Sequence, residues 1–127
     1  MVVLDSSALL ATLLDEPGKE PVDAVIGDGV MSTVNLAEVV GYFSKQGLSP
    51  ADIATILASI PLTYVEPDAA LAIATGNLRG QTIKSTLSLG DRFCLALAAQ
   101  KGVAAMTSDR KWGEVGAEIG VIVELIR

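Results

Sequence analysis

Short runs of aliphatic and β-branched residues alternate with longer stretches of helical periodicity, and this alternation constrains the fold most. The expected strands are residues 2–5, 30–31, 62–65, 103–107 and 121–125. The expected helices are residues 6–14, 20–26, 32–45, 50–60, 67–78 and 88–101. Strands separated by helices form βαβ units with a parallel sheet. We therefore predict an α/β protein, a three-layer α/β/α sandwich with a central parallel sheet.

The boundaries of these elements follow from capping residues. Ser32, Ser49 and Ser88 each precede a helical stretch and are typical N-caps, while Gly47 and Gly102 follow helices as C-terminal stops. Two segments lack a clear pattern. We expect a loop at residues 79–87 and a loop with a short helical turn at residues 108–115.

The length and composition indicate one domain spanning residues 1–127. Half of the residues are hydrophobic but only 4% are aromatic, so the core must consist of small aliphatic side chains. The apolar run 93–99 is far shorter than the ~20 residues of a membrane span, and no basic leader precedes it. Cys94 is the only cysteine, so we predict no disulfide, a core position for Cys94 and a cytoplasmic location without membrane contact.

The charged residues exclude several kinds of chemistry. Nine basic and fifteen acidic residues give a net charge of −6, and the chain has no histidine. Ser-His-Asp and Cys-His nucleophiles are therefore excluded, as is zinc held by histidine or by several thiolates. An acidic chain is also a poor general binder of nucleic acid, because such binding depends on neutralising phosphates.

Four acidic residues stand where an α/β sheet would bring them together. Asp5 and Asp109 follow predicted strands, Asp91 lies in the first turn of a helix, and Glu38 lies within two turns of a helix start. Ligands of open parallel sheets bind at the carboxyl ends of the strands. Each aspartate also has an ordinary interpretation as a cap or turn residue. Glu38 has none, because it lies too far into its helix.

Several carboxylates on one rim would repel each other, by on the order of 4 kcal/mol for a pair ~4 Å apart at an effective dielectric of ~20. A divalent cation would neutralise them. Ligand sets made only of oxygen favour hard cations, here Mg²⁺ or Mn²⁺. Such sites suit phosphoryl chemistry, because the cation activates water and stabilises charge on phosphate oxygens.

Four segments around these acids resemble the signature blocks of PIN-domain nucleases, and most closely those of VapC-type toxins from bacterial toxin–antitoxin pairs. They are VVLDSSALL, STVNLAEV, LSLGDRFCLALA and MTSDRKW, and they span nearly the whole chain in the family's order. Each block alone has low specificity, whereas the four together in a chain of this length are highly specific.

The resemblance implies a PIN-like α/β/α sandwich and Mg²⁺-dependent endonucleolytic cleavage of RNA, with Mn²⁺ as a possible substitute. It also implies a homodimer and a small antitoxin whose tail covers the acidic groove. The residues that it implies as catalytic metal ligands are Asp5, Glu38, Asp91 and Asp109, with Ser6 and Thr107 as supporting hydroxyls. Of the four acids, Asp109 corresponds to the family position that contributes least consistently.

Other functions are compatible with parts of the pattern. A PIN-like fold can serve as a non-catalytic binding or scaffold module, or as an RNA-processing nuclease without an antitoxin. A receiver domain is disfavoured because no lysine ends the strand before Asp109, and a haloacid-dehalogenase phosphatase because Ser7 replaces its second aspartate.

Contacts with RNA are not fixed by the sequence. Five cations near the proposed rim can bind flanking phosphates, or they can form an ordinary solvated face or internal ion pairs: Arg79, Lys84, Arg92, Arg110 and Lys111. Tyr42 and Trp112 can stack on a base, although a core position is expected for both. Asn35 either approaches the site or assists the Ser32 cap.

Overall fold

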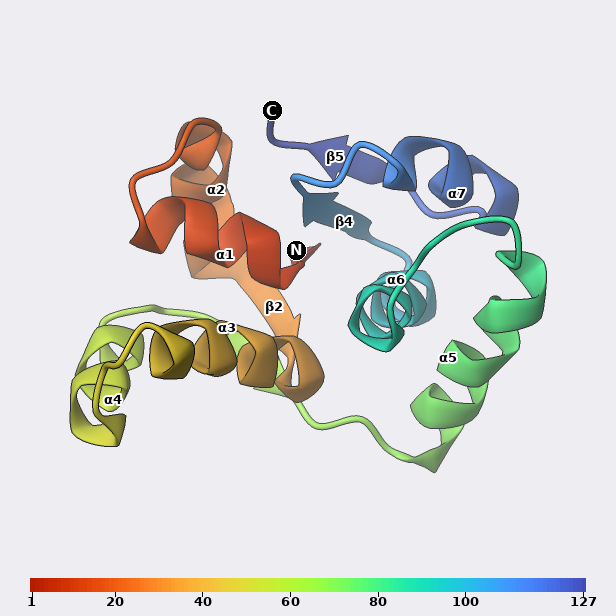
Figure 1. Cartoon of the computed structure of the whole chain (residues 1–127). Coiled ribbons are helices and arrows are strands. Elements are labelled where there is room, and N and C mark those ends of the chain that lie inside the picture. Colours follow the sequence, from red (N-terminus) through yellow and green to blue (C-terminus); the bar gives the residue numbers. More distant parts are fainter.

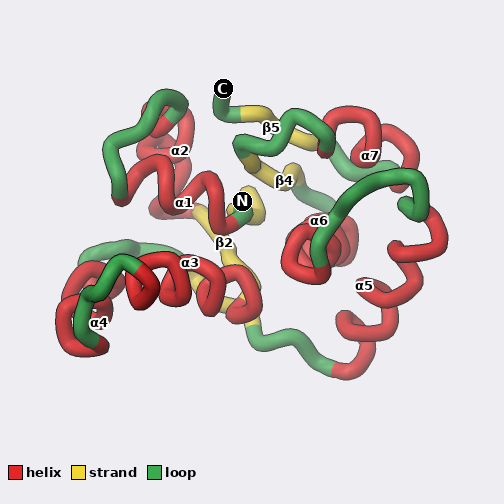
Figure 2. The backbone as a smooth tube through the Cα atoms, in the orientation of Figure 1, coloured by secondary structure: helices red, strands yellow, loops and turns green.

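The computed structural model describes all residues from 1 to 127 and contains a five-stranded, fully parallel sheet (Figures 1 and 2). The strand order is β3-β2-β1-β4-β5. The strands are β1 (Val2–Leu4), β2 (Gly29–Ser32), β3 (Thr63–Val65), β4 (Ala104–Thr107) and β5 (Val123–Leu125). The order reverses direction between β1 and β4, and the carboxyl edge at such a point is where open parallel sheets bind ligands.

Seven α-helices cover the two faces of the sheet. They are α1 (Ser6–Leu13), α2 (Lys19–Val25), α3 (Thr33–Lys45), α4 (Pro50–Ala58), α5 (Ala69–Gln81), α6 (Leu89–Lys101) and α7 (Trp112–Ile119), with a 3-10 turn at Ile26–Asp28. Figure 1 shows α1 to α4 on one side of the sheet and α5 to α7 on the other. The predicted three-layer α/β/α sandwich is confirmed.

Strand β1 shows how the sequence produces two cores. Side chains alternate between the faces of a strand, so Val2 and Leu4 pack with the α1–α4 layer, whereas Val3 packs with the α5–α7 layer. All three are buried, which explains why β1 reads as a continuous apolar run. Cys94 is also fully buried in the second core, as predicted.

The predicted caps of α3, α4 and α6 are confirmed. The hydroxyl of Ser32 accepts a hydrogen bond from the Val34 N–H at 3.1 Å, and that of Ser49 accepts one from the Asp52 N–H at 3.2 Å. Gly102 ends α6 with a φ of 65°, a left-handed conformation that favours glycine. None of the helices combines the length and apolar character needed to cross a membrane.

Two predictions about loops were wrong in part: residues 82–87 and 108–111 lie outside helices as expected, but residues 79–81 and 112–115 are helical. Helix α5 continues to Gln81, three residues past its expected end, and Thr82 then donates its hydroxyl to the Leu78 carbonyl at 2.7 Å. The segment after β4 contains the complete helix α7, because Trp112 and Val115 bury their side chains in the core. The last turn of α5 is exposed, so its helical form is not explained by burial, whereas Trp112 and Val115 anchor α7 with a helical spacing that its glycines interrupt.

Candidate active site

Asp5 follows β1 at the centre of the sheet and is held between two strands. Its backbone N–H donates to the Met106 carbonyl of β4 at 2.9 Å. Its carboxylate accepts hydrogen bonds from the Ser7 hydroxyl at 2.7 Å and from the Thr107 hydroxyl at 2.9 Å. Although Asp5 is the N-cap residue of α1, its side chain bonds no helix N–H. The capping interpretation is therefore wrong for Asp5.

The environment of Asp5 opposes its negative charge. Only 4% of the residue is exposed, and this burial raises the pKa of its carboxyl above the usual value. The hydrogen bonds from Ser7 and Thr107 lower the pKa, while the nearby charges of Asp91 and Glu38 raise it further. The balance is unfavourable to a bare carboxylate.

Ser7 is a site residue that the sequence did not single out. Its hydroxyl bonds Asp5, lies 3.2 Å from the Thr107 hydroxyl and accepts the Ser108 N–H at 3.0 Å. Ser6, chosen as the supporting hydroxyl, reaches Asp5 only at 3.5 Å. Thr107 makes the close contact expected of a supporting residue. The serine pair gave no basis for preferring the second hydroxyl over the first.

Glu38 is exposed on α3 and is oriented by a buried amide. The Asn35 side-chain amide donates to Glu38 Oε1 at 2.8 Å and to the Gly90 carbonyl of α6 at 3.1 Å. Asn35 is fully buried, so it fixes α3 against the start of α6. Asn35 thus approaches the site, rather than assisting the Ser32 cap.

Gly90 makes this close approach possible. A Cβ atom at position 90 would lie 2.4 Å from Glu38 Oε2, a separation that real Cβ atoms do not show. The glycine therefore leaves the space that the Glu38 carboxylate occupies. Sequence reasoning missed this role, because a glycine at the start of a helix has no distinctive local pattern.

Asp91 forms the capping box that its spacing predicts. The Ser88 N–H donates to Asp91 Oδ2 at 2.9 Å, and the Asp91 N–H donates to the Ser88 hydroxyl at 3.1 Å. Its other carboxylate oxygen, Oδ1, makes no hydrogen bond within the protein. Asp91 therefore has a structural role and still offers one oxygen to the rim.

Asp109 lies apart from the other three acids in its contacts. Its Oδ1 accepts the Lys111 N–H at 3.0 Å, and its Oδ2 lies 3.8 Å from the Lys111 ammonium. Its own N–H donates to the Thr107 hydroxyl at 3.1 Å. Asp109 is not among the residues whose charges act on Asp5. The turn interpretation describes its present contacts.

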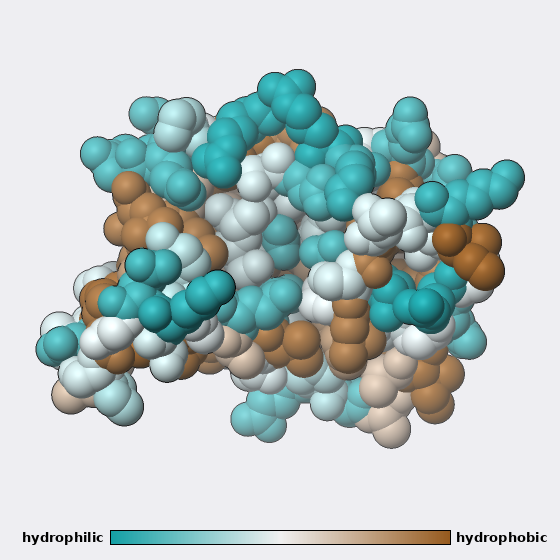
Figure 3. All heavy atoms as spheres, in the orientation of Figure 1, coloured by the Kyte–Doolittle hydropathy of each residue, from teal (hydrophilic) through white to brown (hydrophobic).

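The three remaining acids gather around the start of α6. The fully buried thiol of Cys94, one turn along α6 from Asp91, has a pKa well above its usual value, mainly because of burial and then because of the charges of Asp5, Asp91 and Glu38. Figure 3 shows hydrophilic side chains at the centre of this face, between the two helical layers.

The donor chemistry of this cluster fits a hard divalent cation, because carboxylate oxygens are its only charged donors. The buried charge of Asp5 and the space left by Gly90 fit the same interpretation. In the present conformation, no three acidic or cysteine side chains are close enough together to form a metal-binding group. The residues here that would hold such an ion are Asp5, Glu38 and Asp91.

Comparisons with known proteins bear on the family and on the fold. The family model described as "PIN domain" matches residues 2–118. No curated protein matches the chain in sequence.

Several solved structures share the fold over nearly their whole length. A toxin–antitoxin complex from Klebsiella pneumoniae has a TM-score of 0.77 at 16% identity, covering 100% of this chain and 98% of that chain. DNA-bound VapBC from Salmonella typhimurium has a TM-score of 0.77 at 20% identity, covering 99% and 98%. The sarcin-ricin loop cleaving toxin VapC20 of Mycobacterium tuberculosis has a TM-score of 0.73 at 15% identity, covering 91% and 95%.

Proposed function

This chain belongs to the PIN-domain family, and from that premise we propose that it is a divalent-metal-dependent endoribonuclease, the toxin of a toxin–antitoxin pair. Asp5, Glu38 and Asp91 are the proposed metal ligands and catalytic acids. Asp109 is proposed as a weaker fourth, since its carboxylate is already bonded at Lys111. Mg²⁺ is the proposed ion, and Mn²⁺ a substitute.

One observation carries the proposal, namely the buried carboxylate of Asp5. It caps no helix, pairs with no cation and faces two further acids. A folded protein gains nothing from such a charge, because burial and like charges both destabilise it. A cation shared by the three carboxylates would reverse that balance. When bound, a divalent ion supplies activation of water and stabilisation of charge on phosphate oxygens.

The other residues of the site hold the acids in position. Ser7 and Thr107 donate to one oxygen of Asp5, Oδ2, which leaves Oδ1 with only the long contact to Ser6. Asn35 donates to Oε1 of Glu38 and leaves Oε2 facing Gly90. Asp91 contributes Oδ1. Each acid thus has one oxygen tied to the protein and one available to a ligand.

RNA as the substrate and an antitoxin as the partner are supported by the similar structures, which include toxin–antitoxin complexes and a sarcin-ricin loop cleaving toxin. A homodimer in the cytoplasm is part of the same proposal. A non-catalytic PIN-like scaffold is the main alternative, and an RNA-processing nuclease without an antitoxin is a second one.

A cleavage assay on the purified chain tests the proposal. Single-stranded and structured RNA would be incubated with Mg²⁺, with Mn²⁺ and with EDTA, using the wild type, Asp5→Asn and a control, Asp52→Asn. Asp52 is exposed on α4, so the control removes the same charge away from the site. We expect cleavage with either metal by the wild type and the control only.

Calorimetric titration of Mg²⁺ and Mn²⁺ gives a second readout. Wild-type protein that cleaves no RNA and binds neither ion would support the scaffold alternative. The RNA-processing alternative would be supported if the protein cleaves RNA but co-expression of an adjacent reading frame does not change the growth of cells that produce it.

A further inference from the structure

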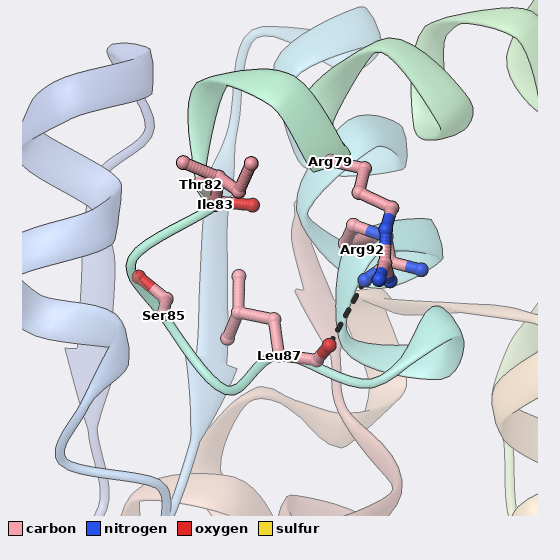
Figure 4. A pocket seen from close by; sticks show the side chains of 6 residues that line it. All are labelled: Arg79, Thr82, Ile83, Ser85, Leu87 and Arg92. Carbon is pink, nitrogen blue, oxygen red and sulfur yellow. Dashed lines mark hydrogen bonds between the residues drawn. The ribbon is translucent and has the colours of Figure 1, made fainter.

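A second candidate site lies where α5 connects to α6. A pocket with a cavity volume of about 60 Å³ is lined by Arg79, Thr82, Ile83, Ser85, Leu87 and Arg92. Figure 4 shows the guanidinium groups of Arg79, from α5, and Arg92, from α6, lying close to each other, with the hydroxyl side chain of Ser85 across the pocket. Two cations thus line one small pocket of a chain whose net charge is −6.

Arg92 is an unusual residue to find there. It is only 7% exposed, and burial of a charged side chain normally requires a partner. Its Nη1 donates to the Leu87 carbonyl at 2.9 Å, but its Nε is buried without any hydrogen-bond partner. A buried donor in this state costs free energy unless a ligand satisfies it.

Neither arginine is neutralised by the protein. The five ion pairs of the chain involve other cations, and Arg79 makes no hydrogen bond through its side chain. Two guanidinium groups around one space repel each other unless an anion lies between them. The pocket therefore needs a negatively charged ligand from outside the protein.

The shape and position of the pocket indicate which anion fits. A buried water needs roughly 10–15 Å³ of such volume, so the pocket has room for a larger group such as a phosphate. Guanidinium forks match phosphate oxygens in geometry. Arg92 follows Asp91 directly in α6, so one helix supplies both a lining residue of the pocket and a proposed metal ligand.

We propose that the Arg79–Arg92 pocket is a subsite for a backbone phosphate of the RNA chain, next to the phosphate that is cleaved. This inference deepens the proposed nuclease function and rests on it for the identity of the substrate. It also answers the charge conflict of an acidic nuclease, because a single strand can approach the acids with a neighbouring phosphate held by two cations.

The test measures binding without metal, so that it does not depend on cleavage. Fluorescence anisotropy of a labelled 12-nucleotide single-stranded RNA of mixed sequence would be recorded in EDTA at several KCl concentrations. The proteins are the full-length wild type, Arg79→Gln, Arg79→Lys and the control Lys101→Gln. Lys101 is exposed at the far end of α6, so its variant removes one charge away from the pocket.

We expect Arg79→Gln to weaken RNA binding about tenfold at low salt. The slope of log K against log salt should fall by about 0.7, the value for one phosphate contact on a single strand. Arg79→Lys should retain the slope but lose part of the affinity, because an ammonium cannot form the bidentate contact. Lys101→Gln should match the wild type. Because Arg79 is exposed and makes no internal hydrogen bond, thermal unfolding of its variants should be unchanged.

Three results would overturn the inference. Wild type and Arg79→Gln could show equal RNA affinity and equal salt slope, or Lys101→Gln could lose as much affinity as Arg79→Gln. In the third, Arg79→Gln weakens binding of a poly-glutamate peptide but leaves RNA binding unchanged. The last would assign the pocket to an acidic protein partner. Cleavage by the wild type with an unaffected Arg79→Gln would remove the subsite and leave the nuclease. RNA binding that depends on Arg79, in a protein that cleaves no RNA, would keep the subsite and remove the nuclease.

Discussion

Asp5 and Asp91 both stand at the start of a helix on the same rim, yet the protein uses their carboxylates differently. Asp91 bonds the Ser88 N–H in a complete capping box and is half-buried. Asp5 bonds only hydroxyl side chains, caps nothing and is almost wholly buried. Both residues are acids near a helix start, but only the carboxylate of Asp91 accepts a hydrogen bond from a backbone N–H at the helix end.

This difference shows that helix stability can account for an acid at position 91 but not for one at position 5. The capping box would explain Asp91 even in a protein without catalysis, because it stabilises α6. Nothing in the folding of the chain requires a charge at Asp5, where an uncharged side chain would be buried more easily. Substitutions at these positions should therefore change stability in opposite directions.

The largest effect is expected for Asp5→Asn. We expect RNA cleavage to fall at least about 100-fold, while the metal-free protein gains on the order of 1 kcal/mol of unfolding free energy, or about 4 °C in Tm. Folding raises the pKa of Asp5 above 3.8, so the ionised group destabilises the folded state. The gain should be absent below pH 3.8, grow as the pH rises through the raised pKa and then stay constant. Denaturant unfolding in EDTA across this range measures it, and lower stability of the variant at pH 7 would contradict the comparison.

Asp91→Ala should lose cleavage to a similar extent but lose stability as well. Removal of the reciprocal cap bond to Ser88 costs about 1 kcal/mol. Asp91→Asn is the matched variant, because its amide oxygen can still accept the Ser88 N–H while the charge is removed. Urea unfolding of both variants distinguishes the roles. Cleavage retained in Asp91→Asn would make the cap the only function of this residue.

Gly90→Ala should affect activity without a comparable effect on stability. The added Cβ would occupy the space of Glu38 Oε2 and displace that carboxylate, so we expect about a tenfold loss of cleavage. Alanine is a better helix former than glycine by about 1 kcal/mol, which offsets part of the strain. Cleavage rates and thermal unfolding would be measured beside Gly76→Ala, since no atom lies near a Cβ at that helical position. Equal activity of the two variants would contradict the role of Gly90.

The smallest effect is expected for the serine pair. Ser7→Ala removes the 2.7 Å hydrogen bond to ionised Asp5 and should raise the pKa of this carboxyl further, whereas Ser6→Ala should not. Carbon-13 NMR titration of the aspartate carboxyls in EDTA measures the shift. We expect a few-fold lower cleavage rate in Ser7→Ala at acidic pH. A larger shift of the Asp5 pKa in Ser6→Ala than in Ser7→Ala would contradict the role given to Ser7.

Most of the fold could be predicted because it depends on local patterns. The strand–helix alternation gave the layers, and Ser32, Ser49 and Ser88 gave three helix starts that the structure confirms. Helix α7 was predicted only as a short helical turn, although Trp112, Val115 and Ile119 have the i, i+3, i+7 spacing of an amphipathic helix. Gly113 and Gly116, which are poor helix formers, weaken that local signal.

The positions of three predicted acids agree with the edge of the sheet where the sequence placed them, whereas the residues that support them were not predicted. The charges of Asp91 and Glu38 act on Asp5, but no three acidic side chains form a metal-binding group, and the catalytic role of all four acids stays a proposal. The contacts that position them join segments far apart in the chain, such as Asn35 with Gly90 and Asp5 with Thr107. Such contacts depend on side-chain directions that only the packed structure defines. The hydrogen bond of Asp109 with the Lys111 N–H, away from the other acids, could not be predicted for the same reason.

The burial of Cys94 has a practical consequence. Its thiol, the only one in the chain, is fully enclosed and kept protonated by its surroundings, so alkylating reagents cannot reach it while α6 stays in place. The rate of its modification therefore reports how often the turn beneath the acids opens. Any cation or polynucleotide that ties this rim together would lengthen the lifetime of the free thiol, so a single native atom can serve as a reporter of occupancy.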